Sequence, residues 1–151
     1  MKLVIQRVRS ANVTVDGKEV ARIGQGAVVL CGVAKGDSEI DVRYLARKTS
    51  QLRIYDDEAG RLNKSIGETN GAFLVVSQFT LYAECAKGNR PGYEEAAEAG
   101  EARRLYEEYA RELGILGHEV QTGEFGAKMV VRLANDGPVT IILESRGRTT
   151  P

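Results

Sequence analysis

Apolar residues in the first third of the chain follow the pattern of β-strands. They dominate Lys2–Val8, alternate with polar residues over Asn12–Val15, and form a short run over Ala27–Val33. The turn Asp16-Gly17-Lys18 follows the second segment and the chain returns through Ile23, which is typical of a β-hairpin. The sequence therefore predicts a strand-rich N-terminal part.

Two later segments have helical spacing. The first begins at Ser38, where either Asp37 or Ser38 can cap the start, and is expected to end near Gln51. The second and longer helix is predicted over Tyr93–Leu113, with Gly114 as its C-terminal cap. Its apolar residues fall on one face: Leu105, Tyr106, Tyr109, Ala110 and Leu113.

Four further segments are predicted as strands: Leu52–Tyr55, Ala72–Thr80, Lys128–Ala134 and Val139–Glu144. The order is thus strands, helix, strands, helix, strands, without repeats or low-complexity stretches. This order favours a mixed α/β layer structure in which both helices cover one face of a sheet. Residues 1–151 are expected to form a single domain.

Composition and charge narrow the possible functions. Of the 151 residues, 42% are hydrophobic and 28% charged, and the formal net charge is zero. These values predict a soluble, cytoplasmic protein, because no stretch has the apolar length of a signal sequence or a membrane span. A neutral chain also argues against tight nonspecific binding to nucleic acid, DNA included, although a few local cations can still contact phosphates.

Few residues can carry familiar catalytic chemistry. His118 is the only histidine, so any mechanism with a histidine base must use it. Cys31 lies in an apolar run and is interpreted as a core residue, and Cys85 is too far along the chain to form a metal-binding pair with it. No phosphate-binding glycine loop is present either. We expect neither a metal nor a cofactor.

Two segments place small polar residues next to a constrained backbone: Ser77-Gln78-Phe79-Thr80 and Asn135-Asp136-Gly137-Pro138-Val139-Thr140. They can be read simply as the end of a strand and as a turn. Alternatively, a cis bond at Gly137-Pro138 would aim successive carbonyl groups in one direction. The residues alone leave both interpretations open.

These two segments resemble the signatures of the bacterial and eukaryotic D-aminoacyl-tRNA deacylase family. The resemblance runs from the first strand to the last and includes the loop Lys87-Gly88-Asn89-Arg90-Pro91 and the segment Phe125-Gly126-Ala127. Small departures occur at Glu84, Gly92 and Lys128, outside both signatures.

The resemblance implies a homodimer of three-layer β/β/α subunits that acts on the acceptor end of aminoacyl-tRNA, with its active sites at the subunit interface. The wall of the pocket would be formed by Ser77, Gln78, Phe79 and Thr80, and lined further by Phe125, Gly126 and Ala127. Gly137 and Pro138, steadied by Arg7, would reach into the partner's pocket and select chirality. Binding of tRNA is assigned to Lys87 and Arg90.

Ester hydrolysis is compatible with these residues. Backbone N–H groups near Phe79, Thr80 and Ala127 can stabilise an oxyanion, and the ribose hydroxyl next to the ester can assist an attacking water. Two alternatives stay open. In the first, Thr80 or Ser77 is a covalent nucleophile for another ester; in the second, the chain binds the acceptor end of a tRNA without cleaving it.

Overall fold

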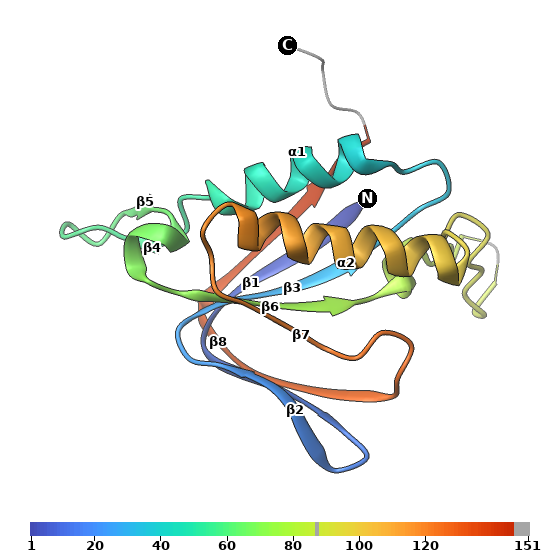
Figure 1. Cartoon of the computed structure of the whole chain (residues 1–151), viewed down its shortest axis with the longest axis horizontal. Helices are drawn as coiled ribbons and strands as arrows, with labels where there is room; N and C mark the ends of the chain where they lie inside the picture. The colour runs from blue at the N-terminus through green and yellow to red at the C-terminus, as the bar shows by residue number, and fades with distance from the viewer. Residues whose placement is uncertain (87, 147–151) are drawn as a thin grey trace.

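A computed structural model describes residues 1–86 and 88–146 and shows a curled β-sheet with two helices across one face (Figure 1). The strands are β1 (Lys2–Val15), β2 (Lys18–Ile23), β3 (Gly26–Gly32), β4 (Tyr55–Asp56), β5 (Leu62–Lys64), β6 (Ala72–Ser77), β7 (Val120–Thr122) and β8 (Met129–Glu144). The helices are α1 (Glu39–Ser50) and α2 (Ala99–Ile115), with 3₁₀ turns η1 (Ile66–Thr69) and η2 (Phe79–Tyr82).

The main sheet mixes parallel and antiparallel strands. Its order is β2-β1-β3-β6-β7, and β8 pairs with β1 off this path. The pairs β3–β6 and β6–β7 are parallel, whereas β1 is antiparallel to each of its three partners. The predicted mixed α/β fold is therefore confirmed, and the dimer remains a prediction.

Two hydrophobic cores lie on opposite faces of the central strands. In β6, Phe73 and Val75 pack in the core beneath α1 and α2. Leu74 and Val76 point the other way, into a core closed by β2 and by parts of β1 and β8. Because side chains alternate along a strand, a strand buried on both faces reads as a continuous apolar run. The chain thus has the predicted three layers, with both helices on one side.

β1 and β8 pair along most of their length, and two irregularities interrupt this pairing. Gln6 pairs with Thr140 and Val8 with Asn135, so residues 136–139 of β8 lie opposite the single residue Arg7. The next pair is Ala11 with Leu133, which leaves two residues of β1 opposite one of β8. Such bulges bend strands and redirect side chains.

The strand predictions were correct in place but not always in extent. The hairpin at Asp16-Gly17 is confirmed, and both residues have positive φ, as a tight turn between twisted strands requires. The two predicted N-terminal segments form one strand, β1, and the last two predicted strands form β8. Bulges rather than turns separate their halves, and the polar residues there resemble loop sequence.

Two other strand predictions were wrong in part. Residues 52–54 are not in a strand, and only Tyr55 and Asp56 pair, with β5. The segment predicted as Ala72–Thr80 leaves the sheet at Ser77 and continues as η2.

The longer helix begins later than predicted and ends with a different glycine. Residues 93–98 are not helical, because this segment bonds to the chain after β3: Lys35 N–H donates to Glu95 and Ala97 N–H to Val33. Gly114 lies inside α2, and Gly117, at φ 92°, follows the cap residue Leu116. The predicted apolar face of α2 is buried as expected.

The first helix begins as predicted, at a capping box. Ser38 is the N-cap, and Asp41 accepts hydrogen bonds from its backbone N–H (2.9 Å) and its hydroxyl (3.0 Å). No helix in the described part of the chain is long and apolar enough to cross a membrane.

Candidate active site

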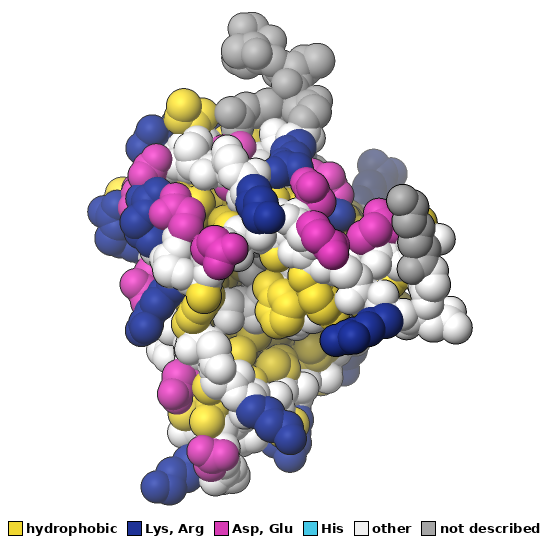
Figure 2. Space-filling view, turned by 90° about the vertical axis from the view of Figure 1, so that its right-hand side faces the viewer, with side chains coloured by type: hydrophobic (Ala, Val, Ile, Leu, Met, Phe, Trp, Pro, Cys, Tyr) yellow, Lys and Arg dark blue, Asp and Glu magenta, His cyan; other side chains and the backbone are white. Residues whose placement is uncertain are grey.

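A cavity of about 500 Å³ opens where β6 ends, and we call it the Ser77 pocket. Figure 2 shows apolar side chains gathered in a hollow on this face of the molecule. The lining residues come from β3, β6, η2, the start of α2, the turn before β8, and β8: Cys31, Val33, Val76, Ser77, Gln78, Phe79, Ala96, Ala97, Ala99, Ala102, Tyr106, Phe125, Gly126, Ala127, Met129 and Val131. The structure thus brings together two groups of predicted residues that lie about fifty positions apart.

The end of β6 shapes one wall of this pocket. Gln78 leaves the regular strand conformation, although its N–H still donates to the Cys31 carbonyl group of β3 (2.8 Å). The first hydrogen bond of η2 is donated by Leu81 to Gln78 (3.3 Å). The N–H groups of Phe79 and Thr80 precede that bond, as the first amides of any helical turn do, so they are available to an incoming oxygen atom.

Thr80 stands beside the pocket rather than in its lining. Its side chain is exposed, and the Gln78 side-chain amide donates a hydrogen bond to its hydroxyl oxygen. An amide N–H cannot accept the proton that a nucleophilic hydroxyl must lose. The contacts of Thr80 therefore favour a positioning role over a covalent one.

The opposite wall is a tight turn in which one backbone N–H group already donates a hydrogen bond within the turn. Gly126 has φ 78°, and Ala127 N–H donates to the Glu124 carbonyl (3.2 Å). That bond makes Ala127 a poorer oxyanion donor than the sequence suggested. Phe125 packs against Tyr106, with ring centroids 5.8 Å apart. The turn is thus held by packing as well as by its own hydrogen bond.

Several lining residues were not predicted from the sequence. Tyr106 was interpreted only as core, but its ring also lines the pocket while its hydroxyl donates to the Val75 carbonyl (2.9 Å). Burial raises the pKa of this hydroxyl, which keeps it protonated. Space in the pocket comes from four small side chains around the start of α2: Ala96, Ala97, Ala99 and Ala102. Their small size was the signal available in the sequence.

Cys31 is a buried core residue, as predicted, and also lies at the base of the pocket. Burial raises the pKa of its thiol to about 12. At neutral pH it is therefore a thiol and not the thiolate that a nucleophile requires. Among the described residues, no group of three or more His, Cys, Asp or Glu side chains is placed to hold a metal ion.

Gly137 and Pro138 form a separate element, joined by a cis peptide bond. Arg7 is buried behind it, and its Nε donates to the Asp136 carbonyl (3.1 Å) while Nη1 donates to that of Ile54 (2.8 Å). A Cβ atom placed on Gly137 would lie 3.2 Å from Arg7 Nη2. The predicted trio of Arg7, Gly137 and Pro138 is thus close together in space.

This trio lies away from the Ser77 pocket of the same chain. Arg7 pairs with Ala27, and Ala27 pairs with Phe73, which is four residues before Ser77 on β6. At roughly 3.3 Å per residue the two levels are about 13 Å apart. Neither Gly137 nor Pro138 lines the pocket.

Comparison with known proteins identifies the family. The model of the D-Tyr-tRNA(Tyr) deacylase family matches residues 4–144. The chain belongs to this family of enzymes. Proteins called D-aminoacyl-tRNA deacylase are 52% identical over 147 residues in Heliobacterium modesticaldum (97% of this chain, 98% of the relative) and 51% identical over 146 residues in Thermosipho africanus (97% and 98%).

Two solved structures have the same fold as this chain. A protein described as c-Myc DNA Unwinding Element Binding Protein is 39% identical, covers 95% of this chain and 98% of its own, and gives a TM-score of 0.90. A probable eukaryotic D-amino acid tRNA deacylase is 16% identical, covers 94% and 97%, and gives a TM-score of 0.78. The second likeness shows that the deacylase fold persists at low sequence identity.

The predicted tRNA-binding cations of this deacylase are described only in part. Arg90 is exposed in the loop that the Glu84–Gly92 bridge closes. Lys87 lies outside the described residues. Their assignment to tRNA binding stays a prediction.

His118 lies far from the Ser77 pocket, near the other end of β6. Its Nε2 is 2.6 Å from the Ser50 hydroxyl, and its ring meets the edge of Phe73 (5.2 Å between centroids). We predict that His118→Asn keeps kcat/KM for D-tyrosyl-tRNA within about twofold of wild type. A large loss of activity in a correctly folded variant would instead make His118 part of the reaction.

The same histidine should affect stability as a function of pH. Burial lowers the pKa of His118 from its usual 6.5, so the unfolded chain binds a proton more readily than the folded one. The contribution of this group to stability is therefore fully present above pH 6.5 and decreases as the pH falls below that value. We expect a smaller drop in unfolding temperature between pH 7 and pH 5 for His118→Asn, measured by thermal denaturation.

Proposed function

We propose that this chain hydrolyses the ester bond of D-aminoacyl-tRNA, releasing the D-amino acid and the tRNA, and that it leaves L-aminoacyl-tRNA intact. The observation that carries the proposal is the Ser77 pocket, which joins Ser77, Gln78 and Phe79 to the Phe125–Ala127 turn in a chain of the deacylase family. Such an enzyme would act in the cytoplasm, where charged tRNAs are used. It would proofread chirality in translation.

The chemistry rests on positioning. An aminoacyl ester is reactive by itself, and its neighbouring ribose hydroxyl can orient or activate water. We assign stabilisation of the developing oxyanion to the N–H groups of Phe79 and Thr80, which precede the first hydrogen bond of η2 beside the pocket. The Thr80 hydroxyl accepts a hydrogen bond from the Gln78 side chain, and among the described residues no base is hydrogen-bonded to it. The covalent alternative predicts an acylated Thr80 on rapid quenching, and our proposal predicts none.

We further propose that Gly137 and Pro138 complete the pocket of a partner subunit. Val131 lines the pocket, and Gly137 is six residues further along β8, or roughly 20 Å at about 3.3 Å per residue. The two elements of one chain are therefore too far apart to contact the same aminoacyl group. If both act on the same aminoacyl group, they come from different subunits.

The exposed strand β8 supports such a homodimer. Its only strand partner in the described part of the chain is β1, so its other edge is unpaired over 16 residues. None of these residues is fully buried, and Val130 and Ile142 are 51% and 62% exposed. Long apolar edges are usually covered in native proteins. A second copy of the chain is the occupant we propose.

Selection by exclusion predicts that glycyl-tRNA is also a substrate. Inverting the α-carbon exchanges a hydrogen for a side chain but leaves the amino group and the ester in place, so an L-ester must be rejected by a clash near Gly137 and Pro138. Glycine has no side chain to clash. We expect glycyl-tRNA to be hydrolysed within about tenfold of the D-tyrosyl ester.

Comparing the hydrolysis of three aminoacyl esters tests both the exclusion mechanism and the proposed function. Glycyl-, D-tyrosyl- and L-tyrosyl-tRNA are incubated with the enzyme under one condition, and ester loss is followed over time. Hydrolysis of the D-ester alone would show that the pocket grips a D side chain and would contradict exclusion. No hydrolysis of any ester, with protection of all three from spontaneous decay, would indicate a binding module instead.

Mixed dimers test the shared site. We expect Gly137→Ala subunits and Phe79→Ala subunits, each strongly impaired as homodimers, to recover activity when mixed, because one of the two sites in a heterodimer then has an intact wall and an intact Gly137. The measurement is deacylation after subunit exchange, with exchange verified by differently tagged subunits. Verified exchange without recovery would place both elements in one subunit's site.

A further inference from the structure

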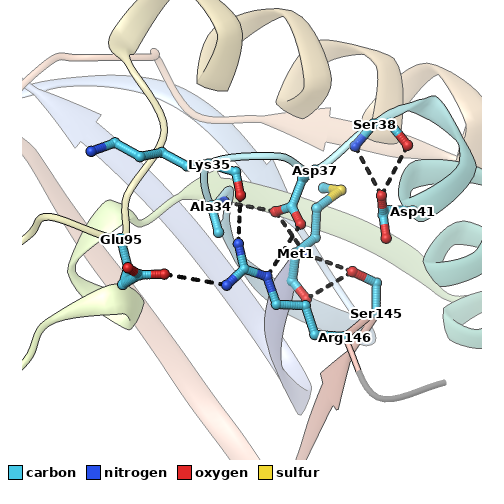
Figure 3. Close-up of polar contacts among 9 residues, drawn as sticks. All are labelled: Met1, Ala34, Lys35, Asp37, Ser38, Asp41, Glu95, Ser145 and Arg146. Carbon is cyan, nitrogen blue, oxygen red and sulfur yellow. Dashed lines mark hydrogen bonds and ion pairs between the residues drawn. The ribbon is translucent and has the colours of Figure 1, made fainter.

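The two described ends of the chain meet in a group of polar contacts (Figure 3). The α-ammonium group of Met1 is buried, pairs with Asp37 (2.7 Å) and donates to the Ser145 hydroxyl (2.6 Å). Ser145 N–H donates to the Met1 carbonyl group (2.9 Å). These contacts fix the residue that follows, Arg146, against the body of the protein.

Arg146 contacts three segments from this position. Its Nη1 pairs with Glu95 (3.3 Å), its Nη2 donates to the Lys35 carbonyl, and its guanidinium carbon lies 6.0 Å from the centre of the Tyr82 ring. Figure 3 shows the side chain extended between Glu95 and Lys35. We call this set of contacts the Arg146 bridge.

Two of these segments are walls of the Ser77 pocket. Tyr82 ends the four-residue turn η2, which carries Phe79 and Thr80. Glu95 directly precedes Ala96 and Ala97, which line the pocket. The Arg146 bridge therefore links the turn proposed to hold the oxyanion with the segment that faces it.

Cationic side chains near both described ends of the chain contact the Tyr82 ring. Lys2 Nζ lies 5.3 Å from its centroid, in addition to the guanidinium group of Arg146. Burial raises the pKa of the Tyr82 hydroxyl, so the ring stays neutral. A Cβ atom on Gly32 would lie 3.3 Å from the ring, which shows how closely β3 supports it.

We propose that Arg146 is a positioning residue for the deacylase reaction, because it sets the distance between η2 and the Glu95–Ala97 segment. This inference rests on the proposed function of the Ser77 pocket. The Arg146 side chain is 47% exposed, and exposed ion pairs contribute little to overall stability. Small displacements of binding groups, in contrast, strongly affect catalysis. Loss of Arg146 should therefore reduce the deacylation reaction more than it reduces folding.

The experiment compares Arg146→Ala and Arg146→Lys with the control Arg111→Ala. Arg111 pairs with Glu108 on the exposed side of α2 and is 60% exposed. We expect Arg146→Ala to lower kcat/KM for D-tyrosyl-tRNA about tenfold at an unfolding temperature close to that of wild type, Arg146→Lys to recover part of the loss, and Arg111→Ala to behave as wild type. A loss of activity no larger than the loss of folded enzyme, or no recovery in Arg146→Lys, would overturn the proposal.

Variants of Tyr82 test the second contact of the bridge. Tyr82→Phe keeps a ring for the two cations, and we expect its kcat/KM to stay near that of wild type; Tyr82→Leu should lower kcat/KM. If Arg146 acts through this ring, the Arg146→Ala, Tyr82→Leu double variant should show a smaller loss of kcat/KM than the product of the single effects. Independent effects would contradict the bridge. Inactivity of the wild-type enzyme would refute the proposed function instead, so the two failures are distinguishable.

Discussion

Gly137→Ala should reduce kcat/KM for D-tyrosyl-tRNA by about 100-fold, since a displacement on the order of 1 Å in a binding group has an effect of this size. Gly137 has φ +123°, a conformation that residues with a Cβ atom rarely adopt. An added Cβ would lie 2.8 Å from Val139 Cγ2 and 3.0 Å from Val139 N. Because the second contact is backbone, the clash must be relieved by moving the element itself.

Gly24→Ala is the matched control for this substitution. No atom lies within 4 Å of the Cβ that it would introduce, and Gly24 is not in the positive-φ region. Deacylation is measured for both variants, together with their unfolding temperatures. Full activity of Gly137→Ala would mean that the position of this element is unimportant for the reaction, and the proposed role in chirality would be wrong.

Arg7→Ala should have the largest effect on stability. Arg7 is 7% exposed, pairs with Asp136 (3.4 Å) and Asp56 (3.6 Å), and donates to two carbonyl groups. Asp136 and Asp56 are 31% and 54% exposed. Arg7 itself is buried, however, and its loss leaves the Ile54 carbonyl group without this donor, so we expect a cost of about 3 kcal/mol. For a chain of this length the unfolding temperature should fall by roughly 6–12 °C.

Arg9 provides the comparison for Arg7, because it pairs with the same carboxylate. Its Nε lies 3.0 Å from Asp136 Oδ1, but its side chain is 81% exposed. Exposed pairs of this kind contribute less than about 1 kcal/mol, so Arg9→Ala should leave the unfolding temperature almost unchanged. Equal losses in the two variants, measured by thermal denaturation, would show that burial of Arg7 is not what stabilises this region.

Local sequence patterns predicted the elements whose structure depends on their own residues. The turn at Asp16-Gly17, the cap at Ser38 and the apolar face of α2 are all in place. The predicted start of α2 at Tyr93 was wrong because residues 93–98 bond to the segment after β3. Such pairing depends on residues sixty positions away, which no local pattern contains.

The candidate site, too, could be predicted only in part from the sequence. The resemblance in sequence suggested Ser77, Gln78 and Phe79 opposite Phe125–Ala127, and the structure places them around one pocket. The sequence did not indicate that Tyr106 lines the pocket. A tyrosine on the sheet-facing side of a helix gives the same sequence pattern whether it packs in a filled core or borders an open cavity. The roles of all these residues in the reaction stay predictions.

The two bulges between β1 and β8 limit where this chain can gain or lose residues. The first lets residues 136–139 protrude opposite Arg7, and the second sends the rest of β1 into the other layer. A one-residue deletion within either bulge would turn every following apolar side chain of that strand to the wrong face. Length variation among relatives should therefore concentrate in turns such as residues 57–61 and avoid these two strands.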